Sequence, residues 1–595
     1  MTNTVDVAVI GAGHAGTEAA LAAARLGVSV VCFSVNLDAV GNMPCNPAIG
    51  GTAKGQLVRE LDALGGEMGK AADKACIQYR LLNRAKGPAV RSLRAQADRN
   101  RYREVIKHML ELEPNLLLVQ AEIVSLEALP DGGFTLITAT GTKWQCKAAV
   151  IASGTYLNGK TIIGEHARIS GPDGLQAAIG LSDSILAFGH SLRRFKTGTP
   201  PRINARSVDF SKMEIQRGDD DGLRFSFETE TPPENRAVCW LTYTTAETHE
   251  ILRSNLHRSP LYSGAIEGIG PRYCPSIEDK VVRFADKARH QLFIEPLGMN
   301  TEEMYVQGFS SSMPEDVQIA ALRSVIGLEH AEITRPAYAI EYDCIDPTEF
   351  TLTLESKLCP GLYGAGQFCG SSGYEEAAVQ GFLAGANAAL KLLRKPPLIL
   401  QRSDGYIGVL IDDLVTKGTN EPYRMMTSRD EFRLLHRGNN ADRRLREKGI
   451  AAEIVKEQTR KKLAAIDGEA ERLERTHVPP GTSLASLLRR PEYDYASLAE
   501  LDTERPELSA DVIEEVETII KYAGYISRQQ REAEEFTRLE NRLLPEDIDY
   551  NAMTTLRLEA RQKLSKLRPI SFGQVARISG VSPSDIAALM IAVRK

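Results

Sequence analysis

The N-terminal segment alternates apolar and small-residue stretches in an order typical of a nucleotide-binding fold. Residues 5–10 form an apolar run, residues 11–16 read Gly-Ala-Gly-His-Ala-Gly, and small residues dominate positions 17–25. A second apolar run covers residues 28–33. The two runs have the length of strands and the segment between them has the length of a helix. The pattern therefore predicts a βαβ unit with a Gly-x-Gly-x-x-Gly turn.

This glycine turn predicts a binding site for a dinucleotide. The first glycine allows the tight bend, the second lets the backbone approach a pyrophosphate, and the third lets the helix pack against the sheet. Free amide groups at the start of the helix favour the phosphates. An acidic residue for the ribose is expected about 20 residues further on, but Ser34, Val35 and Asn36 stand there, so the ribose contact stays unassigned. The residues assigned to the dinucleotide are Gly11, Ala12, Gly13, His14, Ala15 and Gly16.

Two later apolar segments indicate which dinucleotide is bound. Residues 148–155 form a strand that ends in small residues, and residues 362–367 form another, whose glycine turn leads into a helix over 375–390. A nucleotide fold that is interrupted by long insertions and completed much later is typical of two-dinucleotide flavoproteins, so FAD is a better candidate than NAD. The predicted fold class is α/β: a split Rossmann-like FAD-binding domain with insertion domains and an all-helical C-terminal domain.

Changes of pattern along the chain predict the domain boundaries. The FAD-binding domain is expected to comprise residues 1–200 and 275–397, with a small β insertion at 112–147. Residues 201–274 are predicted to form an insertion domain that includes an acidic, solvated loop. Residues 398–595 show apolar positions at helical spacing and are predicted to form the helical domain.

Composition and charge fit a folded protein but leave room for a polyanionic partner. Of the 595 residues, 43% are apolar and 25% are charged, as in ordinary globular proteins. The net charge of −6 excludes a polybasic chain. Basic residues nonetheless gather at 80–107, 424–448 and 557–577. These stretches are either solvated helix faces or a surface for a polyanion larger than a dinucleotide.

Nothing in the sequence predicts export, a membrane span or a metal site. The first residues lack the basic and apolar regions of a signal peptide, and no apolar run is long enough to cross a membrane. The nine cysteines are scattered without a Cys-x-x-Cys pair, which argues against structural zinc and against a redox dithiol. The sequence therefore predicts a cytoplasmic protein without a metal ion.

Two cysteines lie in proline-bounded loops near cationic residues. Cys45 lies in the loop 43–55, which also contains Lys54, and Cys274 lies in the loop 270–280. Backbone amides and Lys54 are expected to lower the pKa of the Cys45 thiol and make it reactive. The alternative is that each is a buried structural cysteine.

Seven segments, taken in order, carry a resemblance to a known family. They include Cys-Asn-Pro-Ala-Ile-Gly-Gly at 45–51 and Lys-Thr-Gly-Thr-Pro-Pro-Arg at 196–202. The sequence resembles, essentially from end to end, the glucose-inhibited division protein A family of FAD-dependent tRNA uridine 5-carboxymethylaminomethyl modification enzymes. The complete set of segments is 11–20, 45–51, 86–91, 196–202, 270–280, 373–377 and 421–425.

The resemblance implies roles for individual residues. The turn 11–16 would hold the FAD pyrophosphate, Ile123 and Ser170 would contact FAD, and Gln367 would lie by the flavin ring. Residues 270–284 match the family's NADH-binding stretch. Cys45 and Cys274 match its functionally important cysteines, and Lys54 is grouped with them as a catalytic candidate. The residues expected to bind NADH are Gly270, Arg272, Tyr273, Lys280, Arg283 and Phe284.

The resemblance also implies a reaction and its partners. NADH would reduce FAD, methylenetetrahydrofolate would supply one carbon, and glycine or ammonium would supply the amine that is added at C5 of the wobble uridine of certain tRNAs. A thiolate matters because uracil reacts at C5 only after a nucleophile adds at C6. A GTPase of the same pathway would be needed, held by a homodimer in a heterotetramer, with the C-terminal helices as the docking surface.

Three alternatives remain open at this point. The nearest is a folate- and FAD-dependent tRNA uracil methyltransferase, a family that is shorter and lacks the long helical C-terminal region. The second is a plain FAD- and NADH-dependent oxidoreductase that acts on a small molecule. The third is a scaffold without enzymatic activity, for which both cysteines would be dispensable.

Overall fold

A computed structural model describes residues 3–220, 222–455, 460–479, 481–545 and 547–593 of the chain. Its centre is a seven-stranded sheet in the order β6-β2-β1-β9-β8-β7, and β20 also pairs with β9. The parallel part confirms the predicted α/β fold class with a Rossmann-like core, because β1, β2 and β6 follow one another in parallel across one half of the sheet. The bounds are β1 (Asn3–Ile10), β2 (Val30–Ser34), β6 (Leu116–Gln120), β9 (Lys143–Ile151) and β20 (Leu362–Gly364).

The two halves of the nucleotide fold meet through a pair of closely packed helices. Helix α1 (His14–Arg25) follows β1, and helix α9 (Tyr374–Leu392) follows β20. A Cβ atom at Gly381 would lie 1.8 Å from the Ala15 carbonyl oxygen, and one at Gly385 would lie 2.1 Å from that of Ala19. Only glycine therefore allows this separation between the helices, and it brings the start of α9 beside the glycine turn.

The short strands expected within 112–147 belong to the central sheet. Strands β7 (Ile123–Ala128) and β8 (Phe134–Thr138) pair antiparallel with each other, and β8 pairs with the first half of β9. The second half of β9 pairs in parallel with β20 instead. The sheet therefore forks at β9, and the fork places Ile123 close to the end of β1.

A second sheet of six strands forms most of the inserted part, in the order β14-β15-β16-β17-β13-β18. Its strands span residues 202–335, so the boundary predicted at residue 274 differs from the structure: 275–335 lie with the insertion. The pairing of β16 with β15 crosses the helix α7 (Ile277–Arg283), and no local pattern of residues reports such a distant pairing. The bounds are β13 (Arg202–Asn204), β14 (Glu214–Gln216), β15 (Cys239–Tyr243), β16 (Gln291–Pro296), β17 (Glu303–Gln307) and β18 (Ile333–Arg335).

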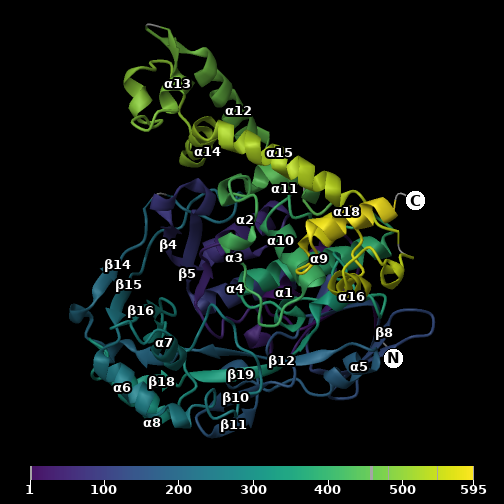
Figure 1. The fold of residues 1–595 in the computed structure, drawn as a ribbon. Coiled ribbons are helices and arrows are strands. Elements are labelled where there is room, and N and C mark those ends of the chain that lie inside the picture. Colours follow the sequence, from purple (N-terminus) through teal and green to yellow (C-terminus); the bar gives the residue numbers. More distant parts are fainter. Residues whose placement is uncertain (1–2, 221, 456–459, 480, 546, 594–595) are drawn as a thin grey trace.

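Helices α6 (Ala246–Ser254), α7 and α8 (Glu315–Arg323) accompany this sheet at the lower left of Figure 1. Two smaller sheets lie between it and the nucleotide fold. One has the order β11-β10-β19-β12 and the other the order β3-β5-β4. The bounds are β3 (Ala48–Gly50), β4 (Cys76–Leu82), β5 (Ser92–Ala97), β10 (Lys160–Ile163), β11 (His166–Ile169), β12 (Leu192–Thr199) and β19 (Tyr338–Ile345).

The acidic loop of the insertion is anchored to the nucleotide fold, contrary to the solvated loop predicted from its composition. The Asp73 carboxylate accepts the amide hydrogens of Phe225 and Ser226, and the Asp62 carboxylate accepts that of Phe227. Both aspartates are buried. Composition alone missed this contact because the acceptors belong to helices α2 (Lys54–Ala63) and α3 (Met68–Ala75), far away in the sequence.

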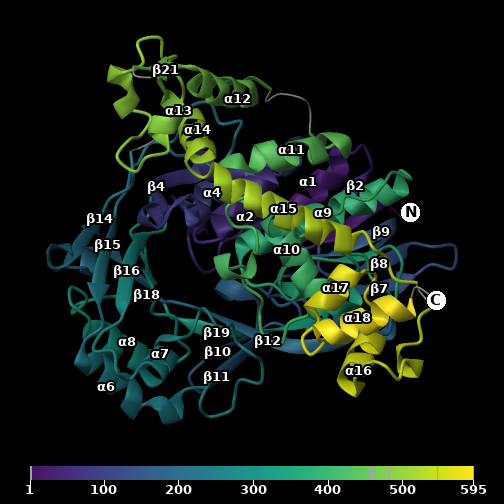
Figure 2. The same cartoon turned by 45° about the horizontal axis from the view of Figure 1, so that its top comes forward.

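The C-terminal region is helical, as predicted, and has two separate apolar cores. Helix α15 (Ala523–Glu540) runs across the nucleotide fold from one bundle to the other (Figures 1 and 2). At the end of the chain Ser582 caps α18 (Pro583–Ala592), with Pro583 at its first position, as the sequence predicts. Among the residues described here, no helix is long and apolar enough to cross a membrane. The other main helices are α11 (Ala441–Ala451), α12 (Arg460–Arg475), α14 (Ala510–Lys521), α16 (Leu558–Leu567) and α17 (Phe572–Arg577).

Candidate functional site

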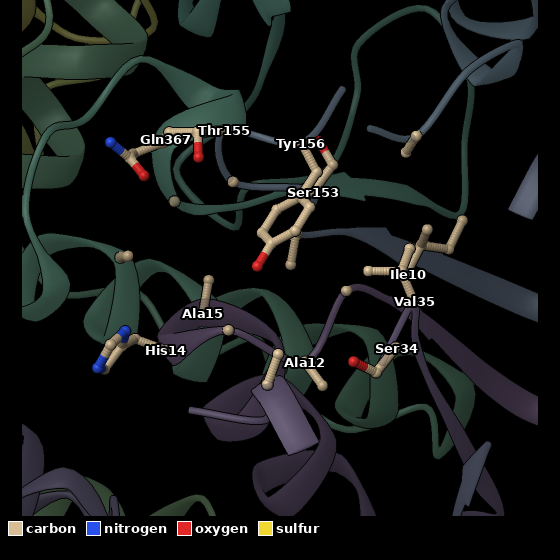
Figure 3. Close-up of a pocket in the computed structure, with 18 of the residues that line it drawn as sticks. Ile10, Ala12, His14, Ala15, Ser34, Val35, Ser153, Thr155, Tyr156 and Gln367 are labelled. Atoms are coloured by element: carbon tan, nitrogen blue, oxygen red, sulfur yellow. The ribbon is translucent and has the colours of Figure 1, made fainter. Parts of the chain in front are cut away.

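A hollow opens where β1 ends and α1 begins. The glycine turn forms one wall, and Tyr156 and Gln367 face it from the opposite side (Figure 3). Of the residues assigned to FAD from the sequence, those that line this hollow are Gly11, Ala12, Gly13, His14, Ala15, Ile123 and Gln367.

The glycines of the turn fit a bound dinucleotide. A Cβ atom at Gly11 would lie 2.3 Å from the Ala152 carbonyl oxygen, and one at Gly16 would lie 1.6 Å from that of Gly11, so both glycines are needed for the turn itself. A Cβ atom at Gly13 would meet nothing within 4 Å. Helix α1 begins without a side-chain cap and without an acidic residue in its first turn. Its amide groups are therefore available to phosphate oxygens.

None of the described residues that line this hollow is an aspartate, glutamate, lysine or arginine, so an acidic ribose contact is not among them. Ser34 and Val35 line it, whereas the Asn36 side chain accepts the Asp38 amide hydrogen at 2.8 Å and caps the short helical turn that follows. Ser153 also lines the hollow, although no sequence motif assigned it, and its buried hydroxyl has no hydrogen-bond partner among the described residues. The sequence at 148–155 predicted a strand that ends in small residues, but it did not indicate that one of them would offer a hydroxyl to a ligand.

Ser170 lies apart from the other residues assigned to FAD. Its hydroxyl is 2.6 Å from that of Thr161, and it lines a neighbouring hollow together with Arg202, Arg335 and Tyr338. Ser170 is buried, so the hydroxyl faces the interior of this part of the fold.

A larger cleft adjoins the FAD hollow and contains all three catalytic candidates. Cys45, Lys54 and Cys274 line it. Tyr374 and Gln367 line both the cleft and the FAD hollow, so the two spaces share a wall. Loops that are distant in the sequence are thus brought together at the edge of the hollow where the flavin ring is expected.

Polar groups from distant strands and from helix α9 contact Cys45. Its sulfur is 3.2 Å from the Tyr305 hydroxyl and 3.6 Å from the Gly198 carbonyl oxygen, and its amide donates to the Tyr374 hydroxyl at 3.0 Å. Burial raises the pKa of the Cys45 thiol, although Tyr305 and Arg202 act in the opposite direction. The expectation that this pKa is lowered was wrong: Cys45 is only half-buried, but the loss of hydration around its sulfur outweighs the groups that stabilise a thiolate.

Lys54 is held by two carboxylates that come from a distant helix. Its ammonium lies 2.7 Å from Glu375 and 3.0 Å from Glu376, at the start of α9. Burial acts to lower the pKa of Lys54, but the two carboxylates raise it overall. Because Glu375 also accepts the Gly50 amide hydrogen at 2.6 Å, this cluster joins α2, β3 and α9.

The stretch expected to bind NADH forms the loop before α7 and the helix itself. Ser276 caps α7, and the ring of Phe284 just beyond it is exposed. Lys280 donates to the Gly308 carbonyl oxygen at 2.9 Å, and Arg283 pairs with Asp279 at 2.9 Å. Within this stretch, Arg272 and Tyr273 are exposed, Cys274 is half-buried, and Gly270 lies against the Lys196 side chain.

The cleft also contains polar residues that the sequence analysis did not assign. Arg94 pairs with Glu295 at 2.7 Å, and Arg424 lies near the two cysteines. Tyr305 and Glu295 belong to adjacent strands and directly face each other across the pairing of β16 with β17. The alternation of polar and apolar residues in these two strands was the available signal.

The basic stretch 424–448 is largely neutralised within the chain. Arg437 pairs with Glu515 at 2.6 Å, Arg444 with Glu60 at 2.9 Å, and Arg446 with Glu228 at 3.2 Å. These pairs join α11 and the turn before it to α2, to the acidic loop and to α14. The cationic side chains that remain exposed include Lys86, Arg433 and Lys566, one from each basic stretch.

The comparisons with known proteins agree along the whole chain. Residues 6–396 match the family model described as glucose inhibited division protein A, and 443–530 and 532–595 match the models for the C-terminal helical domain and helical bundle of the tRNA modifying enzyme MnmG/GidA. A Caldicellulosiruptor saccharolyticus protein named tRNA uridine 5-carboxymethylaminomethyl modification enzyme MnmG is 56% identical over 609 residues, covering 98% of this chain and 97% of that protein. The crystal form II structure of Aquifex aeolicus GidA superposes with a TM-score of 0.93 at 45% identity, covering 100% of this chain and 99% of that one. The chain therefore belongs to the glucose-inhibited division protein A family.

Proposed function

We propose that the protein modifies C5 of the wobble uridine of certain tRNAs, adding a carboxymethylaminomethyl or aminomethyl group. The observation that carries the proposal is the position of Cys45 and Cys274 in one cleft that shares a wall with the FAD hollow. A base in this cleft would contact a thiol on one side and the flavin on the other. Relatives that are named tRNA uridine 5-carboxymethylaminomethyl modification enzymes support uridine in tRNA as the substrate.

FAD, when bound, supplies the redox chemistry, with NADH as reductant and methylenetetrahydrofolate as the one-carbon donor. The glycine turn would hold the pyrophosphate, and Gln367 would orient the flavin ring. Tyr374 would fix the Cys45 loop relative to the flavin, since it lines the hollow and accepts the Cys45 amide hydrogen. Ser170 would contact FAD only from the neighbouring hollow that it lines.

The cysteines would activate the base. Uracil is unreactive at C5 until a nucleophile adds at C6, and Cys45 or Cys274 would supply that nucleophile as a thiolate. C5 would then bond to the electrophilic one-carbon unit supplied by methylenetetrahydrofolate, and the nitrogen that carried this unit would take the displaced electron pair. A basic side chain of the cleft would take the proton from C5, and departure of the sulfur from C6 as a thiolate would restore the C5–C6 double bond. Lys54 would act through the position of Glu375 and the Gly50 backbone rather than by contact with the base.

The partners are assigned on the family resemblance. Residues 270–284 would bind NADH with Arg272 and Tyr273, which are exposed. The two C-terminal bundles would bind tRNA and a GTPase of the same pathway, with a homodimer of this chain in a cytoplasmic heterotetramer. The exposed cations of the three basic stretches would contact tRNA phosphates.

Nucleoside mass spectrometry of tRNA tests the proposal directly. Cells that carry Cys45→Ser or Cys274→Ser in place of the wild-type protein are expected to lose the C5-modified wobble uridine, while the purified variants keep their flavin. Cys239→Ser is the matched control, because Cys239 lines the same cleft but is buried against Gln78. Unchanged wobble uridine in both test variants would refute the role of the thiols, and unchanged wobble uridine in cells that lack the protein would refute the function.

A further inference from the structure

The six-stranded sheet of the insertion turns one of its faces to the cleft. In β16, Leu292 and Ile294 are buried in the apolar core of the insertion, whereas Phe293 and Glu295 alternate with them and line the cleft. In β17, Met304 and Val306 belong to the same core, and Gln307 lines the cleft opposite Phe293. A strand turns successive side chains to opposite faces. The sheet therefore offers an aromatic ring, an amide and a carboxylate at one end of the cleft.

The Glu295 carboxylate is incompletely satisfied. The residue is fully buried, and one of its oxygens, Oε1, accepts from Arg94 at 2.7 Å. The other oxygen, Oε2, has no hydrogen-bond partner among the described residues. Arg94 also donates to the Gln307 side-chain oxygen at 3.2 Å, which directs the NH₂ group of that amide away from Arg94. A buried carboxylate oxygen without a donor is costly, so an N–H group from a ligand would be stabilised there.

The position of Glu295 relative to Cys45 indicates the kind of ligand. Glu295 lies directly across the sheet pairing from Tyr305, whose hydroxyl is 3.2 Å from the Cys45 sulfur. A ligand between them would present a reactive carbon to the sulfur and an N–H to the carboxylate. In uracil, C6 and N3–H lie on opposite sides of the six-membered ring, and a carbonyl oxygen lies on each side of N3–H. Gln307 can donate to one of those oxygens.

We propose that Glu295, positioned by Arg94, recognises the N3–H of the target uracil while C6 faces Cys45. This inference rests on the proposed function and adds the group that selects the base. Cytosine has no hydrogen on N3 and would direct a lone pair at the carboxylate, so it is rejected. Phe293 supplies a surface on which the base stacks, as single-stranded RNA bases commonly do on aromatic rings.

Binding of three RNA hairpins tests the proposal without catalysis. The FAD-loaded full chain is titrated, by fluorescence anisotropy, into anticodon stem-loops that carry uridine, cytidine or 3-methyluridine at the wobble position and are otherwise identical. The wild-type protein is expected to bind the uridine hairpin roughly tenfold more tightly than the other two, because each of them leaves a buried acceptor unpaired. Equal affinity for all three hairpins would overturn the proposal.

Two variants test whether Glu295 itself carries the preference for uridine. Glu295→Gln is expected to lose the preference for uridine, because Arg94 would hold the amide oxygen and leave the NH₂ group, which can donate to N3 of cytosine but cannot accept from N3–H of uracil. Glu303→Gln is the control, since Glu303 also pairs with an arginine, Arg335, on the exposed side of the insertion. It is expected to keep the preference for uridine, and a preference that survives in Glu295→Gln would overturn the proposal.

The hairpin series on the wild-type protein remains decisive even if Glu295→Gln misfolds. A wild-type protein that discriminates between the hairpins but modifies no uridine would refute the proposed function alone.

Discussion

The Tyr305 hydroxyl lies 3.2 Å from the Cys45 sulfur, although the two residues are 260 positions apart in the sequence. The thiol can donate to the Gly198 carbonyl oxygen, which can only accept, and in that arrangement the tyrosine hydroxyl donates to sulfur. Burial raises the pKa of Tyr305 well above that of a free tyrosine, so the donor stays protonated. Tyr305 is therefore placed to stabilise a Cys45 thiolate in a half-buried site, where loss of hydration otherwise disfavours the charge.

Replacing Tyr305 by Phe is expected to raise the apparent pKa of Cys45 by roughly one to two units, because a hydrogen bond to a charged group contributes about 1.5–3 kcal/mol. The measurement is the rate of iodoacetamide alkylation of Cys45 against pH, followed by peptide mass spectrometry. A Cys274→Ser background leaves Cys45 as the one cysteine of the described chain that is not buried. Other groups that act on Cys45 stay in place, namely Arg202, Arg424, Tyr338 and Tyr374.

Tyr406→Phe is the matched control for that experiment. Tyr406 is fully buried, and its hydroxyl has no hydrogen-bond partner among the described residues. Its removal should leave the alkylation profile of Cys45 unchanged. An identical profile for Tyr305→Phe and the control would show that the hydroxyl does not act on the thiol.

Two glycines of the turn, Gly13 and Gly16, predict different outcomes when replaced by alanine. Gly16→Ala should prevent the turn from forming, because its Cβ atom would lie 1.6 Å from the Gly11 carbonyl oxygen. Gly13→Ala meets no protein atom within 4 Å, so it should fold but bind FAD more weakly, since the methyl group would occupy space needed by the pyrophosphate. The flavin content and the circular dichroism of the purified variants distinguish these cases. Full flavin content in a folded Gly13→Ala would place the pyrophosphate elsewhere.

Local features of the chain were predictable from the sequence. The turn 11–16 and the cap at Ser582 depend on residues that are neighbours in the sequence, and both are present as expected. Cys45 and Cys274 were recognised from their loops and do line one cleft. In each case the sequence signal lies within a few residues of the feature itself.

Features that depend on distant partners were not predictable. Lys54 pairs with Glu375 and Glu376, more than 300 residues later, so its local glycine-rich surroundings did not report these ion pairs. The insertion was assigned too short a range because β16 pairs with β15 across α7. Glu295 belongs to no motif, and only the pairing of β16 with β17 brings it opposite Tyr305.

Lys54→Met should destabilise the protein, because it leaves two buried carboxylates without their cation. Breaking a buried ion pair on one side costs about 3–5 kcal/mol. The raised pKa of Lys54 and the lowered pKa of Glu375 mean that the pairing contributes fully around neutral pH. The contribution is lost as the pH falls through the lowered pKa of Glu375, or as it rises through the raised pKa of Lys54. Guanidinium unfolding at pH 7 measures the loss.

Lys54→Arg keeps the charge and should recover much of that stability. Lys212→Met is the control, because Lys212 pairs with Glu329 on the surface, where such pairs contribute little. A Lys54→Met protein that unfolds like the wild type yet has lost its activity would assign the lysine a direct catalytic role instead.

Asp62 makes the stability of the protein fall as the pH rises. Burial raises the pKa of its carboxyl to about 7, and one of its oxygens, Oδ1, has no partner among the described residues. Between pH 3.8 and about 7 the folded state holds a proton that the unfolded state has lost, so the free energy of unfolding declines through this window and stays low above it.

Asp62→Asn removes the titration but keeps an oxygen for the Phe227 amide hydrogen. The variant should match the wild type near pH 4 and exceed it at pH 8 by up to about 4 kcal/mol, the value of a three-unit shift. Glu18, whose pKa burial also raises to about 7, is present in both proteins, so the difference between their unfolding curves reports Asp62 alone. Guanidinium unfolding from pH 4 to 8 measures that difference, and a constant gap between the two proteins across this range would contradict the burial of a titrating carboxyl beneath the acidic loop.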